Sequence, residues 1–183
     1  MPQTAKKQNH RPLLAALVTL VVLLAATAAI WLAVVRPQLG KGRTETLCDD
    51  FNQSELLHPG DSAAQVFTYD KDLYTIGLEF YLPGANPQGT LEVILSDADT
   101  GEELARSTGV MQNIIPDQYT TLGLDTAVAG QPGRRYQLTV TPHYETDAIL
   151  AVGHSVGVAL WKEQMTVNGT PIDGTMAMQV TYQ

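Results

Sequence analysis

The hydrophobic and polar positions divide the chain into two regions of different character. From Leu13 to Val35, 23 consecutive residues are apolar except for Thr19 and Thr27. About 20 such residues in a helix cross the hydrocarbon core of a bilayer. Both threonine hydroxyls can bond a carbonyl of the preceding helical turn, so neither is costly in lipid. The run predicts a transmembrane helix over residues 13–35.

The residues at both ends of this run are typical of helix boundaries in a membrane. Pro12 precedes it, and proline is tolerated in the first turn of a helix. Trp31 lies near the far end, where an indole ring prefers the membrane interface. Arg36-Pro37 then ends the helix, because a proline ring cannot continue it. We expect a short polar linker over residues 36–45.

The flanking charges predict the orientation of the helix. The twelve residues before it contain no acidic side chain, and positive flanks stay in the cytoplasm. The basic residues of this flank are Lys6, Lys7 and Arg11. We therefore expect a cytoplasmic basic tail over residues 1–12, a single pass through the plasma membrane, and an extracytoplasmic domain over residues 46–183.

A cleaved signal peptide is the alternative for this segment. Ala26-Thr27-Ala28 fits the small-residue pattern of a cleavage site. The apolar region of a signal peptide spans about 7–15 residues, whereas this run continues to Val35. The length favours an uncleaved anchor, and under either interpretation the remainder of the chain lies outside the cytoplasm.

Beyond the linker, apolar and polar residues alternate with a period of two, which is typical of half-buried β-strands. The clearest segments are residues 74–82, 91–95, 136–140, 156–160 and 176–182. Shorter segments of the same kind are residues 65–68, 104–108 and 119–124. A short helix-like stretch lies around Asp147–Val152.

Sequences typical of turns separate these strands. Residues 83–87 contain two prolines, residues 97–101 are expected to close a hairpin, and residues 130–133 precede a strand. Asn168-Gly169 and Asp173-Gly174 are pairs that tolerate the positive φ of type I′ turns. About eight short strands with such turns predict an all-β antiparallel sandwich, jelly-roll-like, after the transmembrane α-helix.

The order of motifs along this region also resembles a known group of domains. An aromatic-rich strand (residues 73–80) is followed by residues 89–95, an acidic hairpin, a Gly-x-x-Tyr-x-Leu-x-Val strand from Gly133, and Val167-Asn168-Gly169. This order resembles the jelly-roll-type extracytoplasmic domains of Gram-positive bacterial membrane proteins. Some of those domains are attached to multi-pass glycosyltransferase-like proteins of envelope polysaccharide synthesis.

That resemblance spans roughly residues 72–182 and implies a carbohydrate-binding-like sandwich. It is carried by turn and strand patterns, and it transfers no binding residue to this chain. The multi-pass transferase part has no counterpart here, so the resemblance implies a binding scaffold without an activity.

The composition supports a packed domain and excludes two kinds of site. Hydrophobic residues make up 44% of the chain, which is sufficient for a core. Cys48 is the only cysteine, so an intramolecular disulfide framework and a cysteine-based zinc site are excluded.

The charge is distributed unevenly and limits the partners. From Thr44 onward there are five basic and 19 acidic residues, a net charge of −14. Nucleic-acid binding requires Lys and Arg to displace the counterions of phosphates, so we expect no nucleic-acid partner. The acidity otherwise suits a solvated, self-repelling surface, cations or basic surfaces.

One acidic hairpin is a candidate metal site. Oxygen-rich loops that contain a glycine bind Ca²⁺ weakly in extracellular modules. The residues of this candidate site are Asp97, Asp99, Glu102 and Glu103. The alternative is a polar hairpin tip, because these residue types are also typical of turns. No other cofactor is expected.

Three aromatic side chains are candidates for a sugar-binding platform, since pyranose faces stack on aromatic rings. They are Trp161, Tyr81 and Tyr144. Tyr81 alternates away from the apolar face of its predicted strand. The alternative is that these rings close the edges of the sandwich or pack on a second buried face.

The residues predict a location and a fold but no reaction, and for Ser/His/Asp hydrolysis the sequence contains no Gly-x-Ser-x-Gly elbow. We expect a non-catalytic, membrane-anchored binding module of the cell envelope, with an envelope glycan or a membrane protein as partner. One alternative is a glycan-processing enzyme that uses paired carboxylates. Another is a structural subunit of a membrane complex, packed through the small residues Ala25, Ala26, Ala28 and Ala29.

Overall fold

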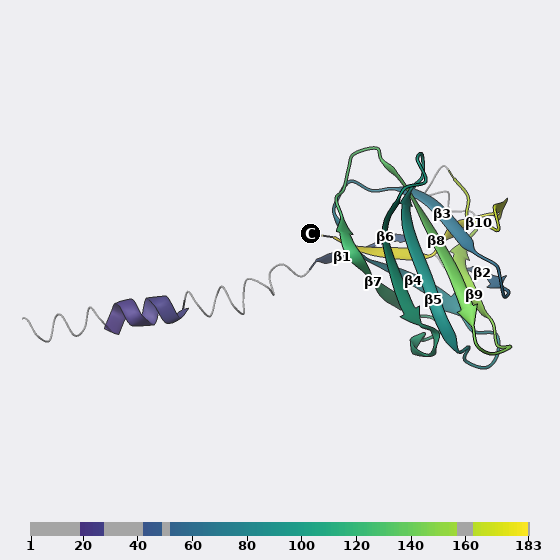
Figure 1. The fold of residues 1–183 in the computed structure, drawn as a ribbon, viewed down its shortest axis with the longest axis horizontal. Helices are drawn as coiled ribbons and strands as arrows, with labels where there is room; N and C mark the ends of the chain where they lie inside the picture. The colour runs from purple at the N-terminus through teal and green to yellow at the C-terminus, as the bar shows by residue number, and fades with distance from the viewer. Residues whose placement is uncertain (1–18, 28–41, 49–51, 157–162, 183) are drawn as a thin grey trace, which may run out of the picture. The chain divides into compact units, whose positions relative to one another are not determined.

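The computed structural model divides the chain into two units, Met1–Lys41 and Gly42–Gln183, which are described separately. Figure 1 shows the described parts as a coloured ribbon. The described residues are 19–27, 42–48, 52–156 and 163–182.

In the N-terminal unit, residues 19–27 form an α-helix. The Thr27 hydroxyl donates a hydrogen bond to the carbonyl oxygen of Leu23, as expected for a threonine in an apolar helix. Within the described ranges, no helix is both long enough and apolar enough to cross a membrane. The remaining positions of the expected span, 13–18 and 28–35, lie outside those ranges.

The C-terminal unit consists of two antiparallel sheets. The strands of the first sheet are β1 (Arg43–Cys48), β2 (Gln53–Leu57), β4 (Leu73–Tyr81), β7 (Tyr119–Val128), β9 (Leu150–Ser155), β12 (Thr175–Met176) and β13 (Met178–Tyr182). Its path runs β1-β13-β4-β9-β12, while β7 pairs with β4 and β2 pairs with β9.

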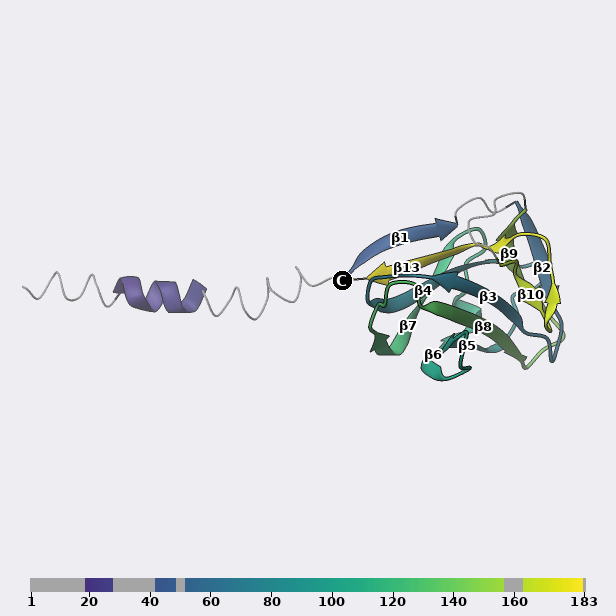
Figure 2. The ribbon, with the colours of Figure 1, turned by 90° about the horizontal axis from the view of Figure 1, so that it is seen from above.

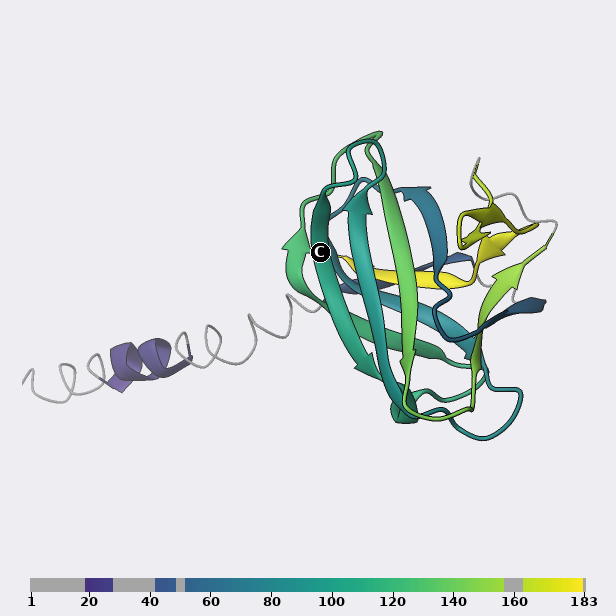
Figure 3. The same ribbon diagram turned by 45° about the vertical axis from the view of Figure 1, so that its right-hand side comes forward.

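The second sheet has the order β11-β10-β3-β8-β5-β6. Its strands are β3 (Ala63–Thr68), β5 (Gly89–Asp97), β6 (Glu103–Val110), β8 (Arg135–Tyr144), β10 (Thr166–Val167) and β11 (Thr170–Pro171). A short 3₁₀ helix, η2 (Met111–Asn113), follows β6. Figures 2 and 3 show how the strands of the two sheets face each other around a common interior.

The core lies between the two sheets, and on the central strands β4, β5 and β8 alternate residues point into it. The inward side chains of the central strands are fully or almost fully buried: Ile76, Leu78 and Phe80 on β4, Leu91, Val93 and Leu95 on β5, and Tyr136, Leu138 and Val140 on β8. The rings of Phe67 and Tyr136 pack with their centroids 5.7 Å apart. Two antiparallel sheets that share one apolar core agree with the predicted β-sandwich class.

Most of the predicted strands are confirmed. The differences lie in strands whose apolar and polar residues do not alternate. The prediction of a helix-like stretch around Asp147–Val152 was wrong, because strand β9 begins at Leu150. All six residues of β9 are buried, so its sequence lacks the alternation that reveals a strand. Residues 157–160 of the strand expected at 156–160 lie outside the described residues.

One boundary and one turn also differ from the prediction. β1 begins at Arg43, so the sheet includes three residues that we expected in the linker. Asn168 and Gly169 have φ values of 50° and 75° and join the paired strands β10 and β11, which confirms a type I′ turn. At Asp173-Gly174 only the glycine has a positive φ, and it joins β11 to β12, which do not pair, so that type I′ prediction was wrong.

The C-terminal strands contain a three-way junction at Ala177. β12 pairs with β9, and β13 pairs with β4. Between them, the Ala177 N–H donates to the Gly153 carbonyl at 2.8 Å, and its carbonyl accepts from the Glu79 N–H at 3.4 Å. Ala177 therefore adds hydrogen bonds to both β4 and β9 at the point where the chain passes from β12 to β13.

Gly89 provides a test of this fold. Its φ is 123°, and an added Cβ would lie 2.0 Å from the His143 carbonyl oxygen on β8. We expect Gly89→Ala to lower the free energy of unfolding by about 2 kcal/mol, since the backbone is strained and the neighbour is main chain. Urea unfolding followed by circular dichroism measures this.

The matched control is Gly84→Ala, since nothing lies within 4 Å of a Cβ at Gly84. It should change the free energy of unfolding by less than about 1 kcal/mol. Equal effects of the two substitutions would contradict the close approach of β5 and β8 at Gly89.

Candidate functional site

The outer face of the first sheet is determined by the alternation along β4. Ile76, Leu78 and Phe80 face the core, so Gly77, Glu79 and Tyr81 project to the opposite side. Residues directly opposite in paired strands project to the same side of the sheet. The strand register therefore identifies the other members of this outer face.

At the end nearest Arg43, this face carries only small polar side chains. Thr44, Thr181 and Thr75 lie in one cross-strand row. The Thr75 hydroxyl donates to the Thr181 hydroxyl at 2.8 Å, and the hydroxyls of Thr181 and Thr44 are 3.3 Å apart. In the next row the Gln179 side chain covers Gly77, where a Cβ would lie 2.4 Å from Gln179 Cγ. Both rows are uncharged.

The next row introduces a carboxylate and an aromatic ring. Glu79 pairs with Tyr119 on β7, and the Tyr119 hydroxyl donates to the Cys48 carbonyl at 2.7 Å. Burial raises the pKa of Glu79, and the negative charge of Asp117 raises it further. No Lys, Arg or His of the described ranges forms an ion pair with Glu79.

The last row is apolar and accessible. Tyr81 pairs with Ala151 on β9, and Ala151 pairs with Leu56 on β2. Tyr81 is 44% exposed and Leu56 is 41% exposed, with the buried methyl group of Ala151 between them. Of the aromatic side chains that the structure describes, Tyr81 is the most exposed. We refer to Leu56, Glu79, Tyr81 and Tyr119 as the Tyr81 site.

The outer face of the second sheet has a different chemistry. Arg106 on β6 pairs with Glu103 at 2.7 Å and with Glu92 at 3.5 Å, and Glu92 also lies 3.7 Å from His143. Such exposed ion pairs are typical of a solvated surface. The first sheet instead presents hydroxyls, an amide, one carboxylate without an ion pair, and an exposed ring.

Of the three aromatic residues proposed from the sequence, the structure places one in this site. Tyr81 projects away from the core as expected. Tyr144 is half-buried, and its hydroxyl donates to the Leu57 carbonyl at 2.6 Å and accepts from the Leu150 N–H at 3.1 Å. It therefore joins β8 to β2 and β9. Trp161 lies outside the described residues.

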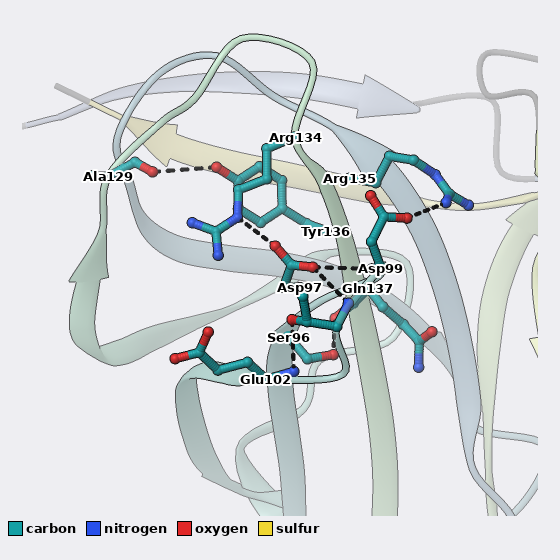
Figure 4. A network of polar contacts seen from close by, with 10 residues as sticks. Ser96, Asp97, Asp99, Glu102, Ala129, Arg134, Arg135, Tyr136 and Gln137 are labelled. Atoms are coloured by element: carbon teal, nitrogen blue, oxygen red, sulfur yellow. Dashed lines mark hydrogen bonds and ion pairs between the residues drawn. The ribbon is translucent and has the colours of Figure 1, made fainter.

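The acidic hairpin proposed as a calcium site is held together by its own hydrogen bonds (Figure 4). One carboxylate oxygen of Asp97 accepts from the N–H groups of Asp99 and Thr100 at 3.0 and 2.9 Å. The other accepts from Arg134 at 2.8 Å. The Thr100 N–H, followed by Arg134, lowers the pKa of Asp97 to about 2. Asp97 thus serves to close the β5–β6 turn.

The other carboxylates of this hairpin point to separate partners. Asp99 pairs with Arg135, which also pairs with Glu163, and Glu103 pairs with Arg106. The Glu102 side chain is exposed, and only its carbonyl bonds back to Asp97. In the part of the chain that the structure describes, no group of three or more His, Cys, Asp or Glu residues is arranged to hold a metal ion. The hairpin-tip interpretation accounts for these residues.

Two hollows elsewhere on the domain offer fewer unpaired charged or aromatic side chains to a ligand. One of about 390 Å³ lies beside Glu45 and Lys71. There Lys71 Nζ is 2.9 Å from Glu45 and 3.9 Å from the centroid of the Tyr182 ring, while Tyr69 donates to Glu45 at 2.9 Å. These groups already satisfy one another. A groove of about 340 Å³ between β6 and β7 is lined without a charged or aromatic side chain.

Comparison with known proteins adds no assignment. No family model matches the chain, and no curated protein matches its sequence. The site is therefore interpreted from its own residues.

Asp97 provides a test of the hairpin. A carboxylate with a lowered pKa stabilises the folded state above its unfolded pKa near 3.8 and loses that effect as the pH falls toward about 2. We expect Asp97→Asn to lower the thermal midpoint at pH 7, with a difference from the unmodified chain that shrinks between pH 4 and pH 2.

The control for this test is Glu102→Gln. It removes a carboxylate from the same hairpin, and the Glu102 side chain is exposed to solvent. It should leave the thermal midpoint at pH 7 unchanged. A loss for Glu102→Gln equal to that for Asp97→Asn would show that net charge, not the hydrogen bonds of Asp97, stabilises the turn.

Proposed function

We propose that this protein is a non-catalytic binding module of the cell envelope, anchored by its N-terminal helix, that holds a glycan on the Tyr81 site. The observation that carries the proposal is the exposed Tyr81 ring beside the carboxylate of Glu79 on the outer face of the first sheet. Sugar recognition combines stacking on an aromatic face with a few polar groups that fix orientation.

The distribution of aromatic rings supports a binding role for Tyr81. Phe67, Phe80 and Tyr136 are each at most 2% exposed, and the hydroxyl of Tyr144 is engaged by main-chain groups. These described aromatic side chains therefore serve the packing of the domain. Tyr81 is left in solvent beside Leu56, which is the arrangement expected of a contact surface.

The sequence supports the location and the type of scaffold. The apolar run at residues 13–35 is long enough for an anchor, and the basic flank before it favours a cytoplasmic N-terminus. The resemblance to jelly-roll-type envelope domains favours a carbohydrate ligand. The site also lies on paired strands, and strands position side chains more rigidly than loops do.

The proposal predicts that removal of the Tyr81 ring abolishes glycan binding without unfolding the domain. The full-length chain, purified in detergent, is tested against an array of bacterial envelope glycans. Tyr81→Ala should lower the affinity for the retained glycan at least tenfold, which corresponds to about 1.4 kcal/mol of lost stacking. Circular dichroism should show an unchanged fold.

The matched control is Val110→Ala on β6 of the second sheet, where the apolar side chain is 50% exposed. Its affinity should equal that of the unmodified chain. If no glycan on the array is retained by the folded protein, or if both substitutions weaken binding alike, the proposed function is wrong.

A further inference from the structure

The Tyr81 site contains a carboxylate that the fold leaves without a cation. Several carboxylates of this domain form an ion pair with a Lys or Arg of the same domain, as at Glu45, Glu92, Asp97 and Glu163. Glu79 is half-buried on the outer face of β4 and has no such partner among the described residues.

The surroundings of Glu79 favour a positively charged ligand group. An ammonium placed beside Glu79 would be attracted by its carboxylate, and the negative charge of Asp117, which raises the pKa of Glu79, would add to that attraction. The face of the exposed Tyr81 ring attracts a cation in addition. The net charge of −14 from Thr44 onward also repels polymers that carry phosphate or carboxylate groups.

The spacing of the site suits one sugar unit. Glu79 and Tyr81 are two residues apart on the same face of β4, which places their Cα atoms about 7 Å apart. A pyranose ring stacked on Tyr81 can therefore direct a substituent on the ring toward Glu79. Tyr81 would then contact the ring of one sugar unit, and Glu79 would contact a substituent on that ring.

We propose that the Tyr81 site selects glycans with free amino groups, the N-deacetylated amino sugars, over their neutral N-acetylated forms and over anionic envelope polymers. This inference rests on the proposed glycan-binding function and specifies its ligand class. An N-acetyl group carries no charge and offers Glu79 only an amide N–H, whereas a protonated amine forms an ion pair with it.

The experiment compares two probes that differ only in acetylation, hexamers of glucosamine and of N-acetylglucosamine. Binding to the full-length protein in detergent is measured by isothermal titration calorimetry at pH 6. The glucosamine hexamer should bind at least tenfold more tightly. Glu79→Gln should reduce this preference to less than threefold while it retains the affinity for the N-acetylglucosamine hexamer.

Two controls separate this site from general attraction to an acidic surface. Glu102→Gln removes the same charge from the β5–β6 hairpin and should preserve the preference. Tyr81→Ala should weaken binding of both hexamers. If Glu102→Gln and Glu79→Gln reduce the preference equally, or if Tyr81→Ala leaves binding intact, the inference is overturned.

The outcomes also distinguish the inference from the proposed function. Equal or tighter binding of the N-acetylated hexamer, or retention of an anionic envelope polymer alone, overturns the amine preference and leaves a glycan-binding module in place. Binding of no glycan by the folded chain overturns both. The comparison of the two hexamers uses the unmodified protein, so it stands even if a variant fails to fold.

Discussion

The alternation of side chains along β4 is the constraint on which the rest of the domain depends. This strand pairs with β13 and β7 along most of its length and with β9 at its end, so its register fixes those of three neighbours. A slip of one residue would expose Phe80 and bury Glu79. The burial of Ile76, Leu78 and Phe80 therefore also determines which side chains reach the outer face.

The polar groups of this domain differ in whether the fold already uses them. Asp97 and Tyr144 have the residue types of ligand-binding groups, but main-chain N–H and C=O groups engage them, and they hold a turn and a strand junction. Glu79 is different, because it is partly withdrawn from water without an ion-pair partner in the described chain. A partly buried polar group whose hydrogen bonds or charge the fold does not use is a more informative sign of a binding site than the residue type alone.

The sequence predicted strands where one face is buried and failed where that condition does not hold. β4, β5 and β8 alternate and were found from their pattern. β9 is buried throughout, and β1 and β2 are edge strands with few apolar positions, so none of the three has the period-two signal. Tyr81 could be placed outside from its phase in β4, but the neighbours Tyr119 and Leu56 depend on cross-strand register, which no local pattern contains. The transmembrane helix and a role for Trp161 stay predictions.

The positions of Arg43 and Tyr81 at opposite ends of the first sheet determine how the sheet would respond to a pulling force. The chain enters the domain at Arg43, beside the row of Thr44 and Thr75, and Tyr81 lies six residues further along β4, about 20 Å away. Tension between these two points would run along the strands, while the ladder hydrogen bonds lie across them. The bonds between β1 and β13 would therefore be loaded together in shear instead of being peeled apart singly. Under the proposed function, tension on a glycan held at Tyr81 would therefore not detach the first strand of the domain one hydrogen bond at a time.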